Sequence, residues 1–171
     1  MGSEMCIRDR REQNLHGQIL RWREARRDPT AVEFEWDIFV LAGERQDADH
    51  SIPANRVGTI KGDLFSSPDG LAFDSAGRLW ILTDADETAP YMNKIGSNQM
   101  LCADPISREV RRFLVGPWGA EITGITWSPD EKAMWVNVQH PGISYPASDG
   151  HSRPRSTTVL ITREDGGVIG S

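Results

Sequence analysis

Acidic side chains lie around a short apolar stretch of the sequence, residues 66–84, which reads SSPDGLAFDSAGRLWILTD. Asp69 stands just before the first apolar run, Asp84 ends the second, and Asp86 and Glu87 follow at once. Carboxylate oxygens are hard ligands that bind calcium in one- or two-oxygen modes. The spacing therefore indicates candidate metal ligands. The alternative is that Asp69 belongs to an ordinary Pro-Asp-Gly turn and that the other three are solvated loop acids.

Two further residues, which come later in the chain, could take part in the same metal-dependent chemistry. Glu121 precedes the apolar segment ITGITW, and His140 follows the segment AMWVNVQ in the sequence QHPG. An imidazole exchanges its proton near neutral pH, which makes His140 a candidate general acid. Both residues also have plainer explanations, since Glu121 could be a surface acid and His-Pro-Gly is common turn chemistry.

Short β signals separated by clusters of Gly, Pro, Asp and Ser make up the rest of the chain, and no segment has a helical period. Their alternation of apolar and polar residues predicts successive hairpins. The expected strands span residues 17–22 and 34–42, 70–74 and 78–83, 98–104 and 109–115, 122–127 and 133–138, and 156–162 and 166–170.

Two of these hairpins repeat one plan. GLAFDSAGRLW begins at Gly70 and GITWSPDEKAMW begins at Gly124, and both run from Gly through an aromatic and a polar turn to Trp. Evenly spaced strands in sets of four are typical of β-propeller blades. We therefore expect an all-β partial propeller of about two and a half four-stranded blades, whereas a closed propeller has about 4 to 8. A β-sandwich with similar hairpins is the alternative.

The complete blade should span residues 66–115, with Trp80 and Trp127 packed between adjacent blades, because large aromatics suit the core between sheets. The first strand of each blade lines the central channel, so the residues before it lie at one mouth of that channel. Asp69 and Glu121 both precede such a strand, in neighbouring blades. Two carboxylates at one mouth could share a calcium ion.

Composition limits the partners. The net charge of −6 argues against a nucleic-acid partner, since phosphate contacts need clustered Lys and Arg. No run of roughly 18 apolar residues is present, so we expect no membrane span. Residues 1–13 show neither strand nor helix periodicity and no apolar core of a signal peptide. They look like a non-native or disordered remnant, and Cys6 is left out with them.

Several motifs resemble the C-terminal part of PhoX-type alkaline phosphatases. They are SSPDGLAFDSAGRLWILTD, NQMLCADPISREVRRFL, GPWGAEITG with QHPG, and TTVLITREDGGVIGS, and the resemblance covers residues 14–171. It implies a β-propeller that hydrolyses phosphate monoesters with calcium and iron, and a periplasmic or secreted parent protein. Asp69 and Glu121 match the acids of the SPDG and E.TG motifs, so the resemblance implies that they are calcium ligands.

The departures from the family pattern are equally informative. Relatives have Gly-Asn after the acid that corresponds to Asp84, whereas this chain has Ala85 and Asp86, which weakens the assignment of Asp84 as a third metal ligand. The cysteine that binds iron and the arginine that holds the phosphate have no counterpart here. Cys102, within an expected strand, is interpreted as a small buried hydrophobe. We therefore expect at most part of a calcium site and no activity of this chain alone.

Two other functions stay open. A calcium-dependent lactonase-like propeller would also contain a segment such as PDGLAFD.AGRLW, although the later GAEITG and QHPG motifs favour the phosphatase. A non-catalytic binding propeller is the second alternative, and it predicts no bound metal.

Overall fold

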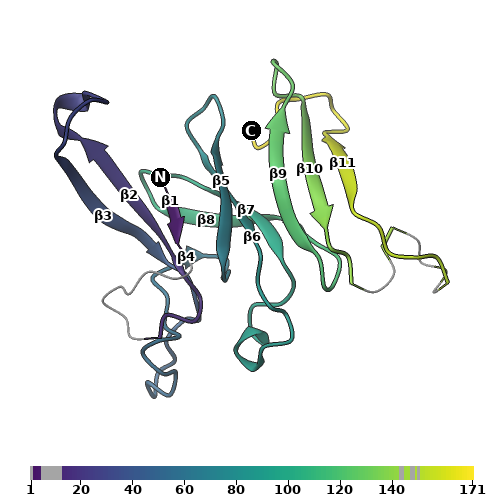
Figure 1. Cartoon of the computed structure of the whole chain (residues 1–171), viewed down its shortest axis with the longest axis horizontal. Helices are drawn as coiled ribbons and strands as arrows, with labels where there is room; N and C mark the ends of the chain where they lie inside the picture. The colour runs from purple at the N-terminus through teal and green to yellow at the C-terminus, as the bar shows by residue number, and fades with distance from the viewer. Residues whose placement is uncertain (1, 5–12, 143–144, 147–148, 150) are drawn as a thin grey trace.

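The computed structural model describes residues 2–4, 13–142, 145–146, 149 and 151–171. Its strands form three open sheets that lie side by side (Figure 1), in the strand orders β1-β2-β3, β4-β8-β7-β6-β5 and β11-β10-β9. Two single turns of 3₁₀ helix, η1 (Ala25–Arg27) and η2 (Pro90–Met92), lie in the connections. The all-β prediction is confirmed, and the open sheets are consistent with part of a β-propeller.

The central sheet contains the predicted complete blade. β5 (Pro68–Phe73), β6 (Leu79–Thr83), β7 (Gln99–Ala103) and β8 (Glu109–Val115) pair antiparallel in sequence order. This confirms the four-stranded blade expected over residues 66–115. A fifth strand, β4 (Lys61–Gly62), adds parallel to β8. The sequence analysis missed β4, because two residues are too short to show a period.

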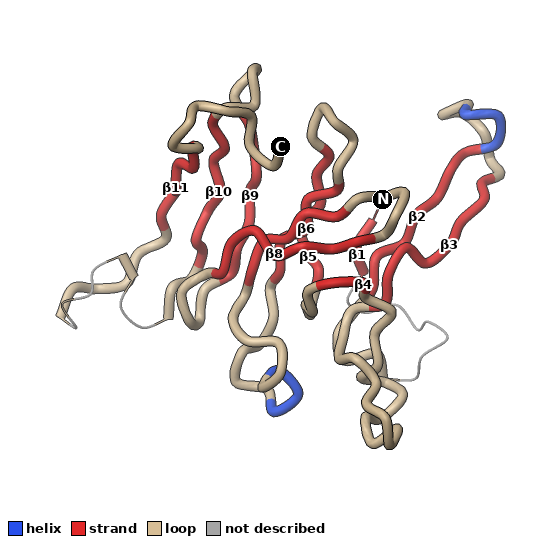
Figure 2. The backbone as a smooth tube through the Cα atoms, turned by 180° about the vertical axis from the view of Figure 1, so that it is seen from behind, coloured by secondary structure: helices blue, strands red, loops and turns tan. Residues whose placement is uncertain are grey.

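The two outer sheets flank this blade. β2 (Gln18–Glu24) and β3 (Phe34–Leu41) form the expected hairpin on one side, and Figure 2 shows the same arrangement from behind. β1 (Gly2–Glu4) pairs with β2. β1 lies within residues 1–13, whose interpretation as a remnant stays a prediction, and Cys6 lies outside the described residues.

On the other side, β9 (Glu121–Trp127), β10 (Ala133–Gln139) and β11 (Thr157–Thr162) form a three-stranded sheet. The fourth strand expected over residues 166–170 is wrong. That segment turns twice, since Gly166 and Gly170 have φ angles of +68° and +80°, which an extended strand cannot accommodate. Ile169 between them is instead buried against the central blade.

The side chains of β6 pack against both of the flanking sheets. All five of its residues are buried, and successive side chains of a strand point to opposite faces. Leu79 and Ile81 belong to the apolar cluster shared with β2 and β3, whereas Trp80 and Leu82 belong to the cluster shared with β9 and β10. One strand thus supplies side chains to the core on both sides of its blade.

The position predicted for the two tryptophans is confirmed. Trp80 has 0% of its surface exposed, and its ring lies 6.1 Å from that of Trp127, in an edge-to-face arrangement. The indole Nε1 of Trp80 donates a 2.8 Å hydrogen bond to Asp74, which also accepts from Arg78. Asp74 and Trp80 of the first copy are therefore structural, because the carboxylate satisfies the buried indole N–H.

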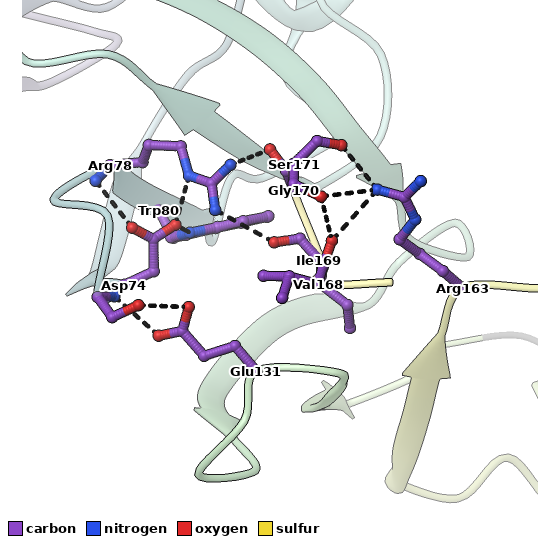
Figure 3. Close-up of polar contacts among 10 residues, drawn as sticks. Asp74, Arg78, Trp80, Glu131, Arg163, Val168, Ile169, Gly170 and Ser171 are labelled. Atoms are coloured by element: carbon purple, nitrogen blue, oxygen red, sulfur yellow. Dashed lines mark hydrogen bonds and ion pairs between the residues drawn. The ribbon is translucent and has the colours of Figure 1, made fainter. Parts of the chain in front are cut away.

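The last residues of the chain join the two blades (Figure 3). Arg78 of the central blade donates hydrogen bonds to the carbonyl oxygens of Ile169 and Gly170. Glu131, in the turn between β9 and β10, accepts bonds from the N–H and hydroxyl of Ser75, both at 2.8 Å. Polar contacts at this end of the strands therefore reinforce the apolar cluster between the blades.

We expect Ile169→Ala to lower the free energy of unfolding by about 2–4 kcal/mol, since it removes a buried side chain and leaves a cavity between blades. Ile169 is 2% exposed, whereas Val32, 96% exposed, offers a matched control. Urea unfolding followed by tryptophan fluorescence measures the difference. Equal midpoints for Ile169→Ala and Val32→Ala would show that the segment contributes nothing to the core.

Candidate functional site

The ends of four strands lie together at the lower edge of the sheets in Figure 1. β5 and β9 begin there and β6 and β10 end there, with β9 in contact with both β5 and β6. We call this edge the mouth edge and define it by Asp69, Asp84, Glu121, Gln139 and His140. It brings together the three acids that the sequence analysis proposed as metal ligands.

Asp69 lies within β5 and not before it, because the strand begins at Pro68, two residues earlier than expected. The pairing of β5 with β6 is irregular between Pro68 and Leu71, and an irregularity of this kind changes the direction in which a side chain points. Asp69 is exposed at this place.

The turn before Asp69 is held by two backbone hydrogen bonds. Ser67 has a φ of +50°, which is unusual for a residue other than glycine. Its N–H donates to the carbonyl of His16 at 2.8 Å, and its carbonyl accepts from the N–H of Asp84 at 3.1 Å. Ser67 therefore sets the direction in which the chain enters Asp69, and its carbonyl also fixes the backbone of Asp84.

Glu121 is the first residue of β9 and pairs with Gln139 at the end of β10. The amide Nε2 of Gln139 donates a 2.9 Å hydrogen bond to Glu121 Oε2. Burial raises the pKa of Glu121, and the negative charges of Asp84 and Asp69 raise it further, against lowering by Thr123 and His140. Asp84, which directly follows β6, and Asp69 in β5 are therefore each close enough to Glu121 in β9 for their charges to act on it.

The carboxylate oxygens of Asp69, Asp84 and Glu121 are of the type that calcium prefers, but they are too few and too far apart to complete a site. Charged carboxylates that face one another favour a shared cation, which removes their repulsion. Over the described residues, however, no three side chains of His, Cys, Asp or Glu come close enough together to hold a metal ion. The mouth edge therefore offers some of the ligands for a cation and needs others.

The pKa of Glu121 gives a prediction on pH. Because its folded-state pKa lies above the ordinary value, ionisation of Glu121 opposes folding as pH rises from 4.5 through the raised value. Without calcium, Glu121→Gln should therefore gain stability over the unmodified chain at about pH 7 and lose that gain at about pH 4. Urea unfolding at the two pH values measures the change.

Asp86→Asn is the control and should behave with the opposite sign. Hydrogen bonds from Thr88 lower the pKa of Asp86, so the stability that this carboxylate provides is present above its unfolded pKa and is lost as pH falls. If Glu121→Gln gave the same small change at both pH values, the three acids would not be electrostatically coupled.

His140 lies beside Glu121 but is exposed. Its φ of +51° places it in a strained conformation directly after β10. Gln139 Nε2 lies 2.9 Å from His140 Nε2, and because the amide nitrogen donates, this ring nitrogen accepts. A pocket of about 490 Å³ opens next to the ring, between β10 and the start of β11. The role of His140 as a general acid stays a prediction.

The two acids after Asp84 have other partners. Asp86 is exposed and accepts bonds from the N–H and hydroxyl of Thr88, at 3.0 and 2.6 Å, which is a turn within its own loop. Glu87 is buried, and its carboxylate accepts from the N–H groups of Asn98 and Gly119, both at 2.6 Å. Glu87 therefore points into the protein and not toward a cation at the surface.

Sequence reasoning missed the residue that organises this loop. Asn98 is buried, and its Oδ1 accepts from Thr83 Oγ1 and the N–H of Ala85, while its Nδ2 donates to the Ala85 carbonyl. These bonds fix the chain on both sides of Asp84. An Asn directly before an apolar strand is the only signal in the sequence, and it is equally typical of turns.

Sequence reasoning also missed a buried pair, His16 and Ser66, which adjoins the turn before Asp69. His16 Nδ1 lies 2.9 Å from Ser66 Oγ, and both residues are buried. A serine beside a histidine suits nucleophilic catalysis, but burial of both side chains keeps a substrate away. The pair supports the turn of Ser67 and has a structural role.

Cys102 is half-buried in β7, against the cluster that contains Trp80. Burial raises the pKa of its thiol to about 11, so the group stays protonated at neutral pH and is no ready ligand for iron. Its interpretation as an apolar side chain agrees with this environment.

Comparison with known proteins gives the following results. Residues 4–142 match the family model described as alkaline phosphatase PhoX. The solved structure of Pseudomonas fluorescens PhoX in complex with vanadate, a transition-state analogue, is 49% identical and superposes with a TM-score of 0.84. The match covers 94% of this chain and 28% of that chain. No curated protein matches. Among the described residues, no helix has the length and apolar character needed to cross a membrane.

Proposed function

The chain belongs to the PhoX family of alkaline phosphatases, and from this premise we propose that it supplies the C-terminal acids of an enzyme that hydrolyses phosphate monoesters. The observation that supports this most is the grouping of Asp69, Asp84 and Glu121 at one edge of the sheets, where their charges interact. A family match alone would not say which part of the chemistry this chain contains. The grouped acids support a role in binding the cation.

The substrate explains why acids would be useful. A phosphate monoester is an anion, and an attacking nucleophile must approach a centre that is already surrounded by negative oxygens. Calcium bound at the mouth edge would offset this charge and polarise the phosphoryl oxygen. Asp69 and Glu121 would hold the cation, and further ligands would come from the longer parent protein. Asp84 would be a third ligand after moving toward the other two, since no three potential ligands among the described residues come close enough here to hold one ion.

The other residues of the mouth edge would act around these ligands. Gln139 would keep the Glu121 carboxylate oriented through the 2.9 Å bond to Oε2. Because Nε2 of His140 accepts from the same amide, its ring proton would be on Nδ1, and His140 would act on the leaving oxygen through that atom. Cys102 would not supply a thiolate for iron, because burial raises the pKa of its thiol to about 11 and the residue lies within β7, so the iron of the parent enzyme would be held by residues outside this chain.

The chain spans 28% of the length of the solved PhoX. We therefore propose that it is part of a longer enzyme, that this enzyme is periplasmic or secreted, and that the part alone is inactive. The motif PDGLAFD.AGRLW also suits a lactonase-like or purely binding propeller, but no observation on the described residues favours either over a phosphatase.

The test uses the full-length protein that contains this sequence. It should hydrolyse p-nitrophenyl phosphate, lose this activity after treatment with a calcium chelator, and be inhibited by vanadate, which imitates the five-coordinate phosphorus of phosphoryl transfer. Hydrolysis of a lactone without hydrolysis of the phosphate ester would contradict the proposal, and so would a metal-free protein without either activity.

A further inference from the structure

Glu87 is a buried carboxylate that the chemistry of the mouth edge does not use directly. It is 7% exposed, and each of its two oxygens accepts one backbone N–H at 2.6 Å. The first donor, Asn98, ends the loop of residues 84–98 that starts at Asp84. The second donor, Gly119, lies two residues before Glu121. One side chain therefore connects the loops that adjoin two of the three acids.

The connection extends to a third loop through close backbone contact. Gly119 has a φ of +77°, and a Cβ placed on it would lie 3.4 Å from the backbone of Gly142. Gly142 follows His140 and Pro141. The N–H of Gly116 also donates to the carbonyl of Asn98 at 2.7 Å. The loops after β6, before β9 and after β10 are thus in contact around Glu87.

From these contacts we propose that Glu87 is a positioning residue for the cation site. Its carboxylate ties loop 84–98 to loop 116–120 and so sets the separation of Asp84 from Glu121. The inference rests on the proposed function, because it takes those two acids as ligands. Groups behind metal ligands that fix their orientation commonly change metal affinity 10–100-fold when removed.

The chemistry of the contact explains why an ionised acid is needed at this position. Two N–H donors meet two carboxylate oxygens, and a charged acceptor shortens and strengthens such bonds. A glutamine has the same shape, but it offers only one oxygen. Its NH₂ group would face the other N–H, which leaves either the buried Asn98 donor or the exposed Gly119 donor without its carboxylate acceptor. Glu87→Gln should therefore release one of the two loops while the apolar cores stay intact.

The first measurement is amide hydrogen exchange by NMR on the 171-residue chain. Glu87→Gln should raise the exchange rate of the Asn98 or Gly119 amide at least about tenfold, because a released amide exchanges by local opening. Amides of β6 should keep their rates, which shows that the variant is folded. Asp86→Asn is the matched control, since the side chain of this neighbouring acid accepts from Thr88 within its own loop, and it should leave both amides unchanged.

The second measurement is the calcium concentration that gives half of the maximal activity in the full-length protein. Glu87→Gln should raise it about tenfold, and excess calcium should restore the activity. A variant that was merely less stable would lose activity at every calcium concentration. Gly119→Ala, strained at its positive φ, disturbs the contact from the other loop and should shift the same concentration in the same direction.

The outcomes separate this inference from the proposed function. Unchanged exchange at Asn98 and Gly119 in folded Glu87→Gln would overturn the role of Glu87, and so would an unchanged calcium requirement. If the full-length protein showed no calcium-dependent phosphatase activity, the proposed function would fail. The exchange rates would then still decide whether Glu87 ties the two loops together.

Discussion

The isolated chain should show no measurable turnover of p-nitrophenyl phosphate under conditions in which the full-length protein is active. Phosphoryl transfer depends on cations and hydrogen-bond donors that are placed together before the substrate arrives. The chain offers three acids at the mouth edge, and nowhere in its described residues do three potential ligands come close enough to hold a metal. Loss of a single such donor already lowers turnover about 10²–10³-fold. Loss of most of the site should therefore bring the rate to the background of the assay.

The comparison needs equal molar amounts of the two proteins, each shown to be folded, in the presence of excess calcium. The near-ultraviolet signal of buried Trp80 reports whether the interface between the blades has formed in the isolated chain. Calcium-dependent turnover by the folded chain alone would show that the site is complete within these residues. The chain would then contain enough ligands to bind calcium by itself.

The strands with a clear apolar pattern were predicted well from the sequence. β6 appears in it as an uninterrupted apolar run, and β10 alternates as AMWVNVQ, with every second residue buried. Such patterns follow from the two-residue period of a strand. The position of Trp80 between blades followed in the same way, since a large aromatic repeated at equivalent places belongs in the core.

The segments that the sequence did not reveal are those that depend on distant partners. β4 exists because two residues lie along the edge of β8. The final segment, residues 166–170, has strand-like composition, but it turns at two glycines and is held by Arg78 from another blade. Both structures depend on contacts between residues far apart in the sequence, so the pattern within a short segment does not predict them.

At the candidate site, the sequence indicated which residues gather there better than it indicated the role of each residue. The grouping of Asp69 and Glu121 at one edge was expected from the repeat, because they stand one and three residues before the equivalent Gly70 and Gly124 of neighbouring blades. By contrast, Glu87 looks like Asp86 in the sequence, yet one is buried between two loops and the other is exposed. Only the path of the loop, which Asn98 determines, distinguishes them.

Replacement of either Asp69 or Glu121 by alanine in the full-length protein should lower calcium affinity about 100-fold and lower activity in proportion at limiting calcium. Residues behind metal ligands already contribute 10–100-fold, and a ligand should contribute at least as much. The two carboxylates begin neighbouring blades, and the charge of Asp69 acts on Glu121, as expected for groups that share an ion whose ligand distances are about 2.3–2.6 Å.

The same substitutions should leave the blades folded, and in the absence of calcium they should slightly stabilise the protein. Two acids that face one another repel when no cation lies between them, so removal of one relieves this cost. Isothermal titration with calcium measures affinity, and thermal unfolding with and without calcium measures stability. Glu35→Ala is the control, since this exposed acid lies in β3, away from the mouth edge. If Asp69→Ala kept normal activity at limiting calcium, Asp69 would be a turn residue and no ligand.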